Sequence, residues 1–341
     1  KQRQLKWWVI ALLWVASLAM TTQAKPILRY DITYKAHYLE CAVLMNEKTI
    51  FNTVRITPRN NPFPNRLYHS HDVTQYVDNG LNKIDVRVAD AVYFLINEKA
   101  EEAYCSVTVT ALEAAIKEDL PKKREVLHLN FTLKEIEDQE GNKRPTVVTE
   151  GSRLHGKPIP EGAIQFAFDE TDDVYADGSL IITFSTYDYQ TMLEQKADLS
   201  WVNRSTPIQD TPAIRELALA KYREISQAIE HEAWDELKEL LEPGLSEMAA
   251  LKFMSREAYF DELREQVFNG IVRDIKYLGW QADVFDPDSY KFAIYANGKL
   301  FEFYHLRNNE ASPTSWTKGK TRMWFSPVLT LINGEVKVGA M

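Results

Sequence analysis

The sequence changes character once, near residue 203, and that change limits the folds open to the chain. Before it, short segments alternate apolar and polar residues between turn residues, most clearly over residues 83–88 and 104–109. Many short strands separated by turns are typical of a β-sandwich. After it, long helical patterns come first and strands follow. We therefore predict a mainly β N-terminal sandwich and an α+β C-terminal domain.

Changes in sequence pattern along the chain indicate where its parts begin and end. The expected parts are a signal peptide (1–24), a β-sandwich (25–202), a linker (203–211) and a helix-then-sheet domain (212–341). Thr211 is predicted to cap the first long helix, with Pro212 at the first helical position. That helix is expected to continue towards residue 241, and a second to cover residues 246–268.

Two Asn-Gly pairs lie between apolar alternating segments near the end of the chain. Asn297-Gly298 separates residues 290–296 from 299–305, and Asn333-Gly334 separates residues 328–332 from 335–338. Asn-Gly in this setting predicts a hairpin with a two-residue turn. Helices followed by a curved antiparallel sheet resemble the NTF2-like α+β cone, which is the fold expected for this part.

Residues 72–88 carry the longest distinctive motif. They begin Asp72-Val73-Thr74 and match the pattern D-V-T-x-x-[LV]-x-x-G-x-N-x-[IL]-x-V-x-V. This segment resembles galactose-binding-like jelly rolls, which occur as sugar-binding or purely structural modules. The resemblance implies a short turn that ends at Gly80. It also implies a following strand whose core side is Ile84, Val86 and Val88, shown by their alternation.

The chain has two cysteines, Cys41 and Cys105, both in segments expected to be strands. In an oxidising compartment two cysteines of one domain usually pair. A disulfide closing a loop of this length would contribute on the order of 4 kcal/mol by restricting the unfolded chain. The alternative is a pair of separate buried thiols, and we predict the disulfide.

The first residues have the three parts of an export signal. Lys1, Arg3 and Lys6 are followed by an apolar run over residues 7–20 and by small residues that end at Ala24. A membrane anchor is the alternative, but a spanning helix needs roughly 20 apolar residues and this run is shorter. We expect cleavage after Ala24 and a periplasmic or secreted protein without a stable membrane anchor.

The charge of the chain bears on its partners. The formal net charge is −9, and loss of the signal peptide would make the protein more acidic. An acidic balance opposes binding to nucleic acid and to anionic membranes, and it is compatible with a basic protein partner.

We find no catalytic or metal-binding signature in the sequence, and we expect no cofactor and no enzyme activity. His69 and His71 could present alternate side chains to a metal, but a polar loop with two exposed histidines is the preferred interpretation. His231 lacks the second histidine that H-E-x-x-H requires, so it is expected on a solvated helix face. No G-x-S-x-G motif occurs.

Some carboxylates and aromatic residues allow a functional alternative. The acidic run over residues 169–173 lacks the spacing of an EF-hand and is expected to be an exposed turn. Asp283, Tyr295 and His305 would be the acid–base candidates if the NTF2-like cone had a pocket. Core or surface positions are the preferred interpretation for all three.

Three residues near the end of the chain are the candidates for a recognition surface. Trp316 and Trp324 lie on either side of a basic loop over residues 318–322 that ends at Arg322, and Trp and Arg are enriched at interface hot spots.

The overall layout resembles periplasmic immunity proteins that protect bacteria against their own type VI secreted toxins. The tail from residues 299–303 to 331–336 carries this resemblance. It implies a non-catalytic protein that neutralises a toxin by stoichiometric binding. The alternatives are a module that binds carbohydrate or the cell envelope, and an enzyme that uses an NTF2-like pocket.

Overall fold

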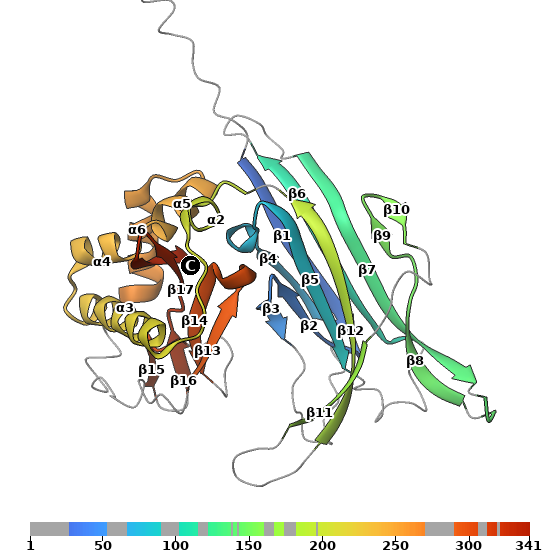
Figure 1. The fold of residues 1–341 in the computed structure, drawn as a ribbon. Coiled ribbons are helices and arrows are strands. Elements are labelled where there is room, and N and C mark those ends of the chain that lie inside the picture. Colours follow the sequence, from blue (N-terminus) through green and yellow to red (C-terminus); the bar gives the residue numbers. More distant parts are fainter. Residues whose placement is uncertain are drawn as a thin grey trace, which may run out of the picture.

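The computed structural model of this chain consists of a β-sandwich beside a smaller α+β part (Figure 1). It describes residues 27–52, 67–89, 102–114, 122–137, 139–141, 143–159, 167–173, 182–195, 197–269, 290–305, 312–318 and 321–341. The signal-peptide prediction lies outside these residues. Strands dominate the first part, and helices followed by strands make up the second, so the mainly β plus α+β fold class is confirmed.

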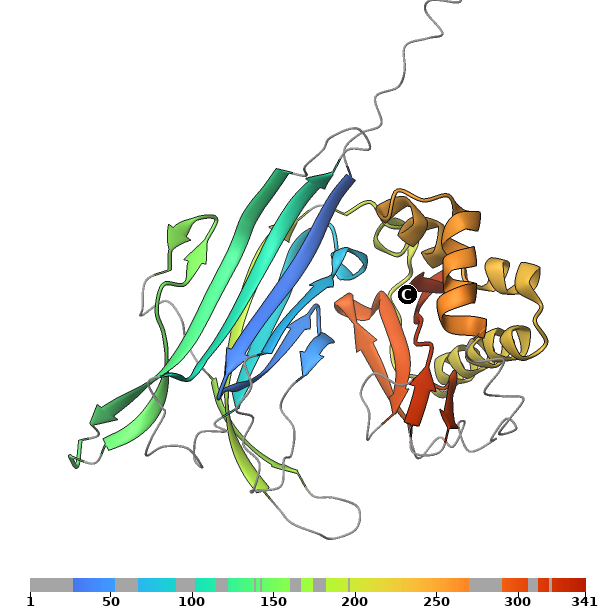
Figure 2. The same cartoon turned by 180° about the vertical axis from the view of Figure 1, so that it is seen from behind.

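The larger sheet of the sandwich has the strand order β10-β9-β7-β6-β1-β4, and β8 also pairs with β7. All of these pairings are antiparallel. The strands are β1 (Ile27–His37), β4 (Leu67–Asp72), β6 (Tyr104–Ala114), β7 (Lys122–Glu137), β8 (Lys143–Thr149), β9 (Arg153–Leu154) and β10 (Lys157–Pro158). Figure 2 shows this sheet in front, with β7, β6 and β1 side by side.

The second sheet has the order β11-β12-β5-β2-β3 and is also antiparallel. Its strands are β2 (Glu40–Met45), β3 (Lys48–Asn52), β5 (Gly80–Ala89), β11 (Ala167–Asp173) and β12 (Ile182–Gln195). Alternate residues of both sheets meet in one apolar core. As predicted, Ile84, Val86 and Val88 are fully buried there, opposite residues such as Tyr34 and Val107.

A disulfide joins the two sheets through this core. Cys41 on β2 and Cys105 on β6 are bonded, their Cα atoms are 6.6 Å apart, and they are 64 residues apart in the sequence. Both are fully buried. The predicted disulfide is therefore confirmed, and it links a strand of each sheet.

The α+β part packs helices on one side of a four-stranded sheet, and Figures 1 and 2 show that sheet between the helices and the sandwich. The sheet order is β13-β14-β17-β18. The strands are β13 (Tyr290–Tyr295), β14 (Leu300–His305), β17 (Val328–Ile332) and β18 (Glu335–Ala340). The helical elements are α2 (Ser200–Arg204), α3 (Pro212–Glu230), α4 (Trp234–Leu240), α5 (Gly244–Leu251), α6 (Arg256–Leu263) and the π-helical turn η5 (Arg264–Phe268).

The start of α3 follows the prediction, because the Thr211 hydroxyl accepts a hydrogen bond from Ile214 N and Pro212 begins the helix. Its end does not. A continuous helix towards residue 241 was expected, but α3 stops at Glu230 and α4 begins at Trp234. Glu232 takes the left-handed conformation (φ 56°), and Ala233 N donates to Ala228 O at 2.9 Å. These are the features of a Schellman helix end.

The second predicted helix is also divided. Phe253 has φ 57°, and Met254 N donates to Ala249 O at 2.9 Å, which again closes a Schellman end. Ser255 then caps α6 by accepting from Ala258 N. The expected helix over residues 246–268 is therefore α5, α6 and η5.

The two predicted hairpins are both present. Asn333 (φ 53°) and Gly334 (φ 81°) form the two-residue turn between β17 and β18, as expected. Between β13 and β14 the turn is longer, because Tyr295 pairs with Leu300 and four residues connect them. Ala296, Asn297 and Gly298 all have positive φ there.

Among the helices that the structure describes, none combines the length and the apolar character needed to cross a lipid bilayer.

Candidate functional site

The candidate site is the junction between the sandwich and the α+β part, where the motif at residues 72–88 meets the second part of the chain. The motif begins with a tightly held turn, the 3₁₀ helix η1 (Thr74–Tyr76). Asp72 Oδ1 accepts hydrogen bonds from Thr74 N at 2.9 Å and from the Thr74 hydroxyl at 2.5 Å. Tyr30 N donates to Thr74 Oγ1 at 2.9 Å, which ties the turn to β1.

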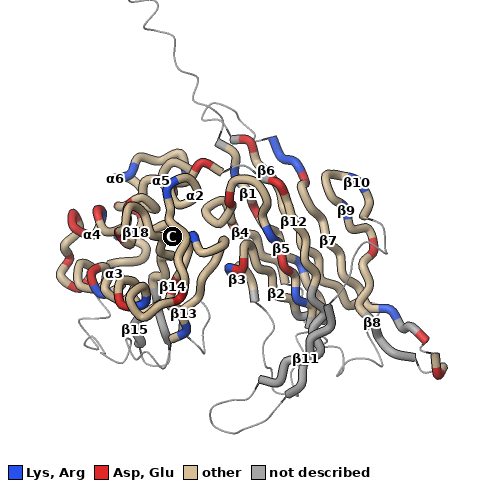
Figure 3. The backbone as a smooth tube through the Cα atoms, viewed as in Figure 1, with Lys and Arg blue, Asp and Glu red and all other residues tan. Residues whose placement is uncertain are grey.

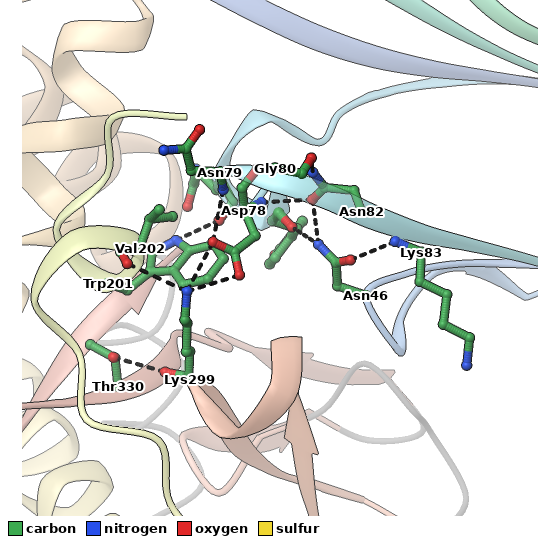
Figure 4. A network of polar contacts seen from close by, with 12 residues as sticks. Asn46, Asp78, Asn79, Gly80, Asn82, Lys83, Trp201, Val202, Lys299 and Thr330 are labelled. Atoms are coloured by element: carbon green, nitrogen blue, oxygen red, sulfur yellow. Dashed lines mark hydrogen bonds and ion pairs between the residues drawn. The ribbon is translucent and has the colours of Figure 1, made fainter. Parts of the chain in front are cut away.

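Asn82 holds the other side of this turn. Its side chain is fully buried, and Oδ1 accepts from Asp78 N and from Asn46 Nδ2, both at 2.7 Å. Its Nδ2 donates to Asp78 O and Gly80 O. Asn46 also donates to Tyr76 O at 2.8 Å, and its Oδ1 accepts from Lys83 N (Figure 4). Two buried amides therefore fix the backbone that leads into β5.

The turn presents its backbone and Gln75 to the α+β part. The Trp201 indole N–H donates to Gln75 O at 3.0 Å, and Gln75 Nε2 contacts Met248 Sδ at 3.2 Å. Gln75 Oε1 accepts from Met341 N. Because Trp201 and Gln75 are both buried, these contacts leave little room for the turn to move against the second part.

An ion pair crosses the junction beside these contacts. Lys299, in the turn between β13 and β14, places its Nζ 3.0 Å from both carboxylate oxygens of Asp78 (Figure 4). The same Nζ lies 3.5 Å from Val202 O, and the Thr330 hydroxyl donates to Lys299 O at 2.9 Å. Asp78 is buried, so this pair is shielded from solvent more than a surface salt bridge is.

A second ion pair crosses the junction at the start of β3. Lys48 Nζ binds Glu302 Oε1, and only 14% of the Lys48 side chain and 2% of the Glu302 side chain are exposed. The Tyr295 hydroxyl donates to the same Glu302 oxygen at 2.8 Å. Burial and the Glu302 charge raise the pKa of Tyr295, so the phenol keeps its proton and remains a donor.

Backbone and apolar contacts complete the junction. Ala296 N donates to Asn46 O at 3.0 Å, which joins the turn after β13 to the turn after β2. An apolar cluster lies between the parts and includes Trp201, Tyr295 and Leu300, with Tyr76 packed against it. The polar groups of this junction are thus paired with each other, and the arrangement can hold two parts of the chain in one orientation.

The structure places the predicted recognition residues on two short paired strands. Trp316 lies on β15 (Ser315–Lys318), and Arg322 and Trp324 lie on β16 (Thr321–Trp324). Trp316 pairs with Met323, and Arg322 pairs with Thr317. Their side chains, and that of His305, lie outside the described residues, as does Asp283. The acidic run over residues 169–173 lies in strand β11, so the prediction of a turn was wrong, and its side chains lie outside the description.

The predicted histidine loop is a strand, and the loop prediction was wrong in that respect. His69 and His71 lie on the edge strand β4, both are exposed, and their ring centroids are 6.5 Å apart. The ring of His71 meets Phe51 edge-on at 4.3 Å. His231 is exposed at the end of α3, as expected, and its Nδ1 lies 2.9 Å from Gln227 O. In the parts of the chain that are described, no three His, Cys, Asp or Glu side chains gather as a metal site.

Sequence reasoning missed the residues that form the junction from the second part of the chain. Lys48 and Glu302 are 254 positions apart, and Asp78 and Lys299 are 221 apart. Asp78 occupies an unspecified position of the motif at residues 72–88, and the other three residues of these pairs lie outside that motif, so no local signal identifies either pair. The motif at residues 72–88 was the one usable signal, and it pointed to fold rather than to this contact.

No family model, curated protein or solved structure matches the chain.

Proposed function

We propose that this protein is an exported, non-catalytic binding protein that neutralises a secreted antibacterial toxin in the periplasm by stoichiometric contact. In this proposal it is an immunity protein of the type VI secretion kind, made with a signal peptide that is cleaved after Ala24. Its sandwich is jelly-roll-like and its second part is NTF2-like. The observation that carries the proposal is the junction, where ion pairs, buried amides and apolar contacts hold the two parts against each other.

A fixed junction favours tight protein binding for a physical reason. A stable complex buries roughly 1,200–2,000 Å² in total, and ordering mobile parts on binding reduces its affinity. If Lys48–Glu302 and Asp78–Lys299 already hold the two parts in one orientation, a partner that contacts both parts does not have to order them.

The charge of the chain supports a basic partner. The formal net charge is −9, and acidic residues outnumber basic ones from the end of α3 through α4 (Figure 3). Glu230, Asp235, Glu236 and Glu239 are exposed there. Such a field accelerates encounter with a positively charged protein, and added salt reduces that advantage.

The test is co-expression of a candidate periplasmic toxin with the full-length chain. Protection should require export, should follow the molar ratio of this protein to the toxin, and should survive single substitutions at His69, His71, His231 and Asp283. Protection by catalytic amounts, or loss of protection in one of those variants while it remains folded, would favour the enzyme alternative. N-terminal sequencing of the exported protein should begin at Lys25, and a start at Lys1 would contradict signal cleavage.

A carbohydrate- or envelope-binding module is the second candidate, and one observation favours it. Tyr68 is 64% exposed on β4, and Lys35 Nζ lies 5.6 Å from its ring centre. Exposed aromatic rings on a polar sheet face can stack on sugars. Co-sedimentation with purified peptidoglycan decides between the two: binding by the wild type that Tyr68→Ala abolishes and Phe253→Ala leaves unchanged would support this candidate over ours.

A further inference from the structure

Two of the large exposed apolar side chains are neighbours on the outer face of the second sheet. Leu81 on β5 is 63% exposed, and Met192 on β12 is 51% exposed. Ile84, Val86 and Val88 face the sandwich core, so Leu81 and Lys83 lie on the opposite face. In the register, Leu81 pairs with Glu194, and Lys83 pairs with Met192. Met192 and Glu194 therefore lie on this outer face too.

These four residues form a small block with a regular arrangement of charge. The block has two positions on each of two adjacent strands and measures roughly 7 Å by 5 Å. Leu81 and Met192 occupy one diagonal, and Lys83 and Glu194 occupy the other. The apolar residues thus lie on a line, with a positive side chain on one side of it and a negative side chain on the other.

We propose that this block is the centre of a contact between two copies of the chain, related by a twofold axis. If the axis lies along the apolar diagonal, each apolar side chain meets its own counterpart. Lys83 of each copy then lies over Glu194 of the other, because rotation about that line exchanges the two charged corners. The block is self-complementary, because apolar side chains meet apolar side chains and opposite charges face each other, as a contact between two identical surfaces requires.

The alternative placement of the axis is unfavourable. With the axis along the charged diagonal, Lys83 would meet Lys83 and Glu194 would meet Glu194 of the second copy, and like charges in contact repel. Among the described residues, Tyr68, Leu217 and Phe253 are also large and exposed, but Tyr68 lies on β4 of the other sheet, and Leu217 and Phe253 lie in different elements of the α+β part. The block on β5 and β12 therefore selects both a second copy as its occupant and one orientation for it.

The contact is expected to be weak. Four residues supply much less than the roughly 800 Å² per partner of a standard interface, so the neighbouring outer-face residues must contribute. We expect a monomer–dimer equilibrium that becomes visible between about 1 μM and about 1 mM protein. This inference is independent of toxin binding, since it concerns the purified chain alone.

Sedimentation velocity over that concentration range is the test. The mature wild type should form a dimer. Glu194→Lys should weaken dimerisation by roughly tenfold or more, because two opposite-charge contacts become like-charge contacts. The double variant Lys83→Glu/Glu194→Lys should restore it, because the exchanged charges still face each other. Met192→Asp should abolish it.

The matched control is Leu217→Asp, which places the same charge at an exposed apolar position on α3 and should leave the dimer unchanged. Lys83 Nζ also lies 3.4 Å from Asp85 Oδ2, so thermal unfolding must show that the double variant is folded. If it is not folded, Glu194→Lys and Met192→Asp decide the result alone. A wild type that is monomeric throughout, or a dimer that Met192→Asp and Glu194→Lys leave intact, overturns the proposal.

Discussion

At the scale of single residues, buried amides explain why the motif at residues 72–88 has the form it has. Asn82 Oδ1 is the acceptor for two buried donors, Asp78 N and Asn46 Nδ2. Gly80 begins β5 with φ +99°, a conformation that side chains other than glycine rarely take. The Asn and the Gly of the motif are therefore explained by hydrogen bonding and by backbone conformation.

Asn82→Ala should lower the free energy of unfolding by on the order of 3 kcal/mol, because two buried donors lose their acceptor. Urea denaturation of the purified protein measures this. Asn79→Ala is the control, since Asn79 is exposed in the same turn and uses only its backbone N–H in the network. Equal stability of the two variants would show that the Asn82 amide does not hold the turn.

Glu247 is expected to make the stability of the fold depend on pH in a defined direction. Ser200 N donates to its Oε1 at 2.7 Å, while its Oε2 is buried without a hydrogen-bond partner within the described structure. Burial raises the pKa of Glu247, so folding favours the protonated carboxyl. That contribution to stability is complete below the ordinary carboxyl pKa and is lost as pH rises through the raised folded value.

Glu247→Gln should therefore stabilise the protein at pH 7 and flatten this part of its pH dependence. Thermal unfolding at a series of pH values measures the difference between variant and wild type, which should shrink towards acid pH as the wild-type carboxyl gains its proton. A stability difference between variant and wild type that grows on acidification would contradict a raised pKa for Glu247.

At the scale of elements, the sequence was a good guide where local chemistry decides the backbone. Asn333-Gly334 formed the expected turn, Thr211 capped α3, and alternation identified the buried side of β5. It failed at the helix breaks, because the left-handed positions there are Glu232 and Phe253 rather than glycine. It also failed at β4, an exposed edge strand whose polar residues lack the alternation of a half-buried strand.

Gly298 lies in a crowded turn, whereas Gly334 lies in an open one. An added Cβ would lie 2.8 Å from Ile208 O, and φ is +88°. Gly298→Ala should lower the free energy of unfolding by roughly 2–4 kcal/mol. Gly334 has a similar φ, but nothing lies within 4 Å of an added Cβ, so Gly334→Ala should lower the free energy of unfolding by only about 1–2 kcal/mol. Denaturant unfolding of both variants measures the difference, and equal costs would contradict the close approach.

The disulfide between the two sheets is expected to stabilise the folded protein. Replacing Cys41 and Cys105 with Ser should lower the free energy of unfolding by about 4 kcal/mol, because the unfolded chain gains conformational freedom. Non-reducing denaturation followed by thiol titration is the accompanying control. Two free thiols per wild-type chain would contradict the bond itself.

At the scale of the whole molecule, the junction is what the sequence could not predict. Its ion pairs join residues more than two hundred positions apart, and each charged residue resembles any surface charge when it is read alone. The candidate recognition residues Trp316, Arg322 and Trp324 remain a prediction. Breaking one side of a buried ion pair leaves the other charge unpaired, so the orientation of the two parts should depend on Lys48 and Lys299.

The claim that the two parts form one body is tested most directly by a distance distribution between spin labels on Arg124→Cys and Glu236→Cys. Both positions are exposed, one on β7 and one on α4. Pulsed electron paramagnetic resonance should give a single narrow distance in the otherwise wild-type protein. The same labels in a Lys48→Ala/Lys299→Ala background should give a broader distribution. A broad or two-peaked distribution before those substitutions would contradict a fixed junction.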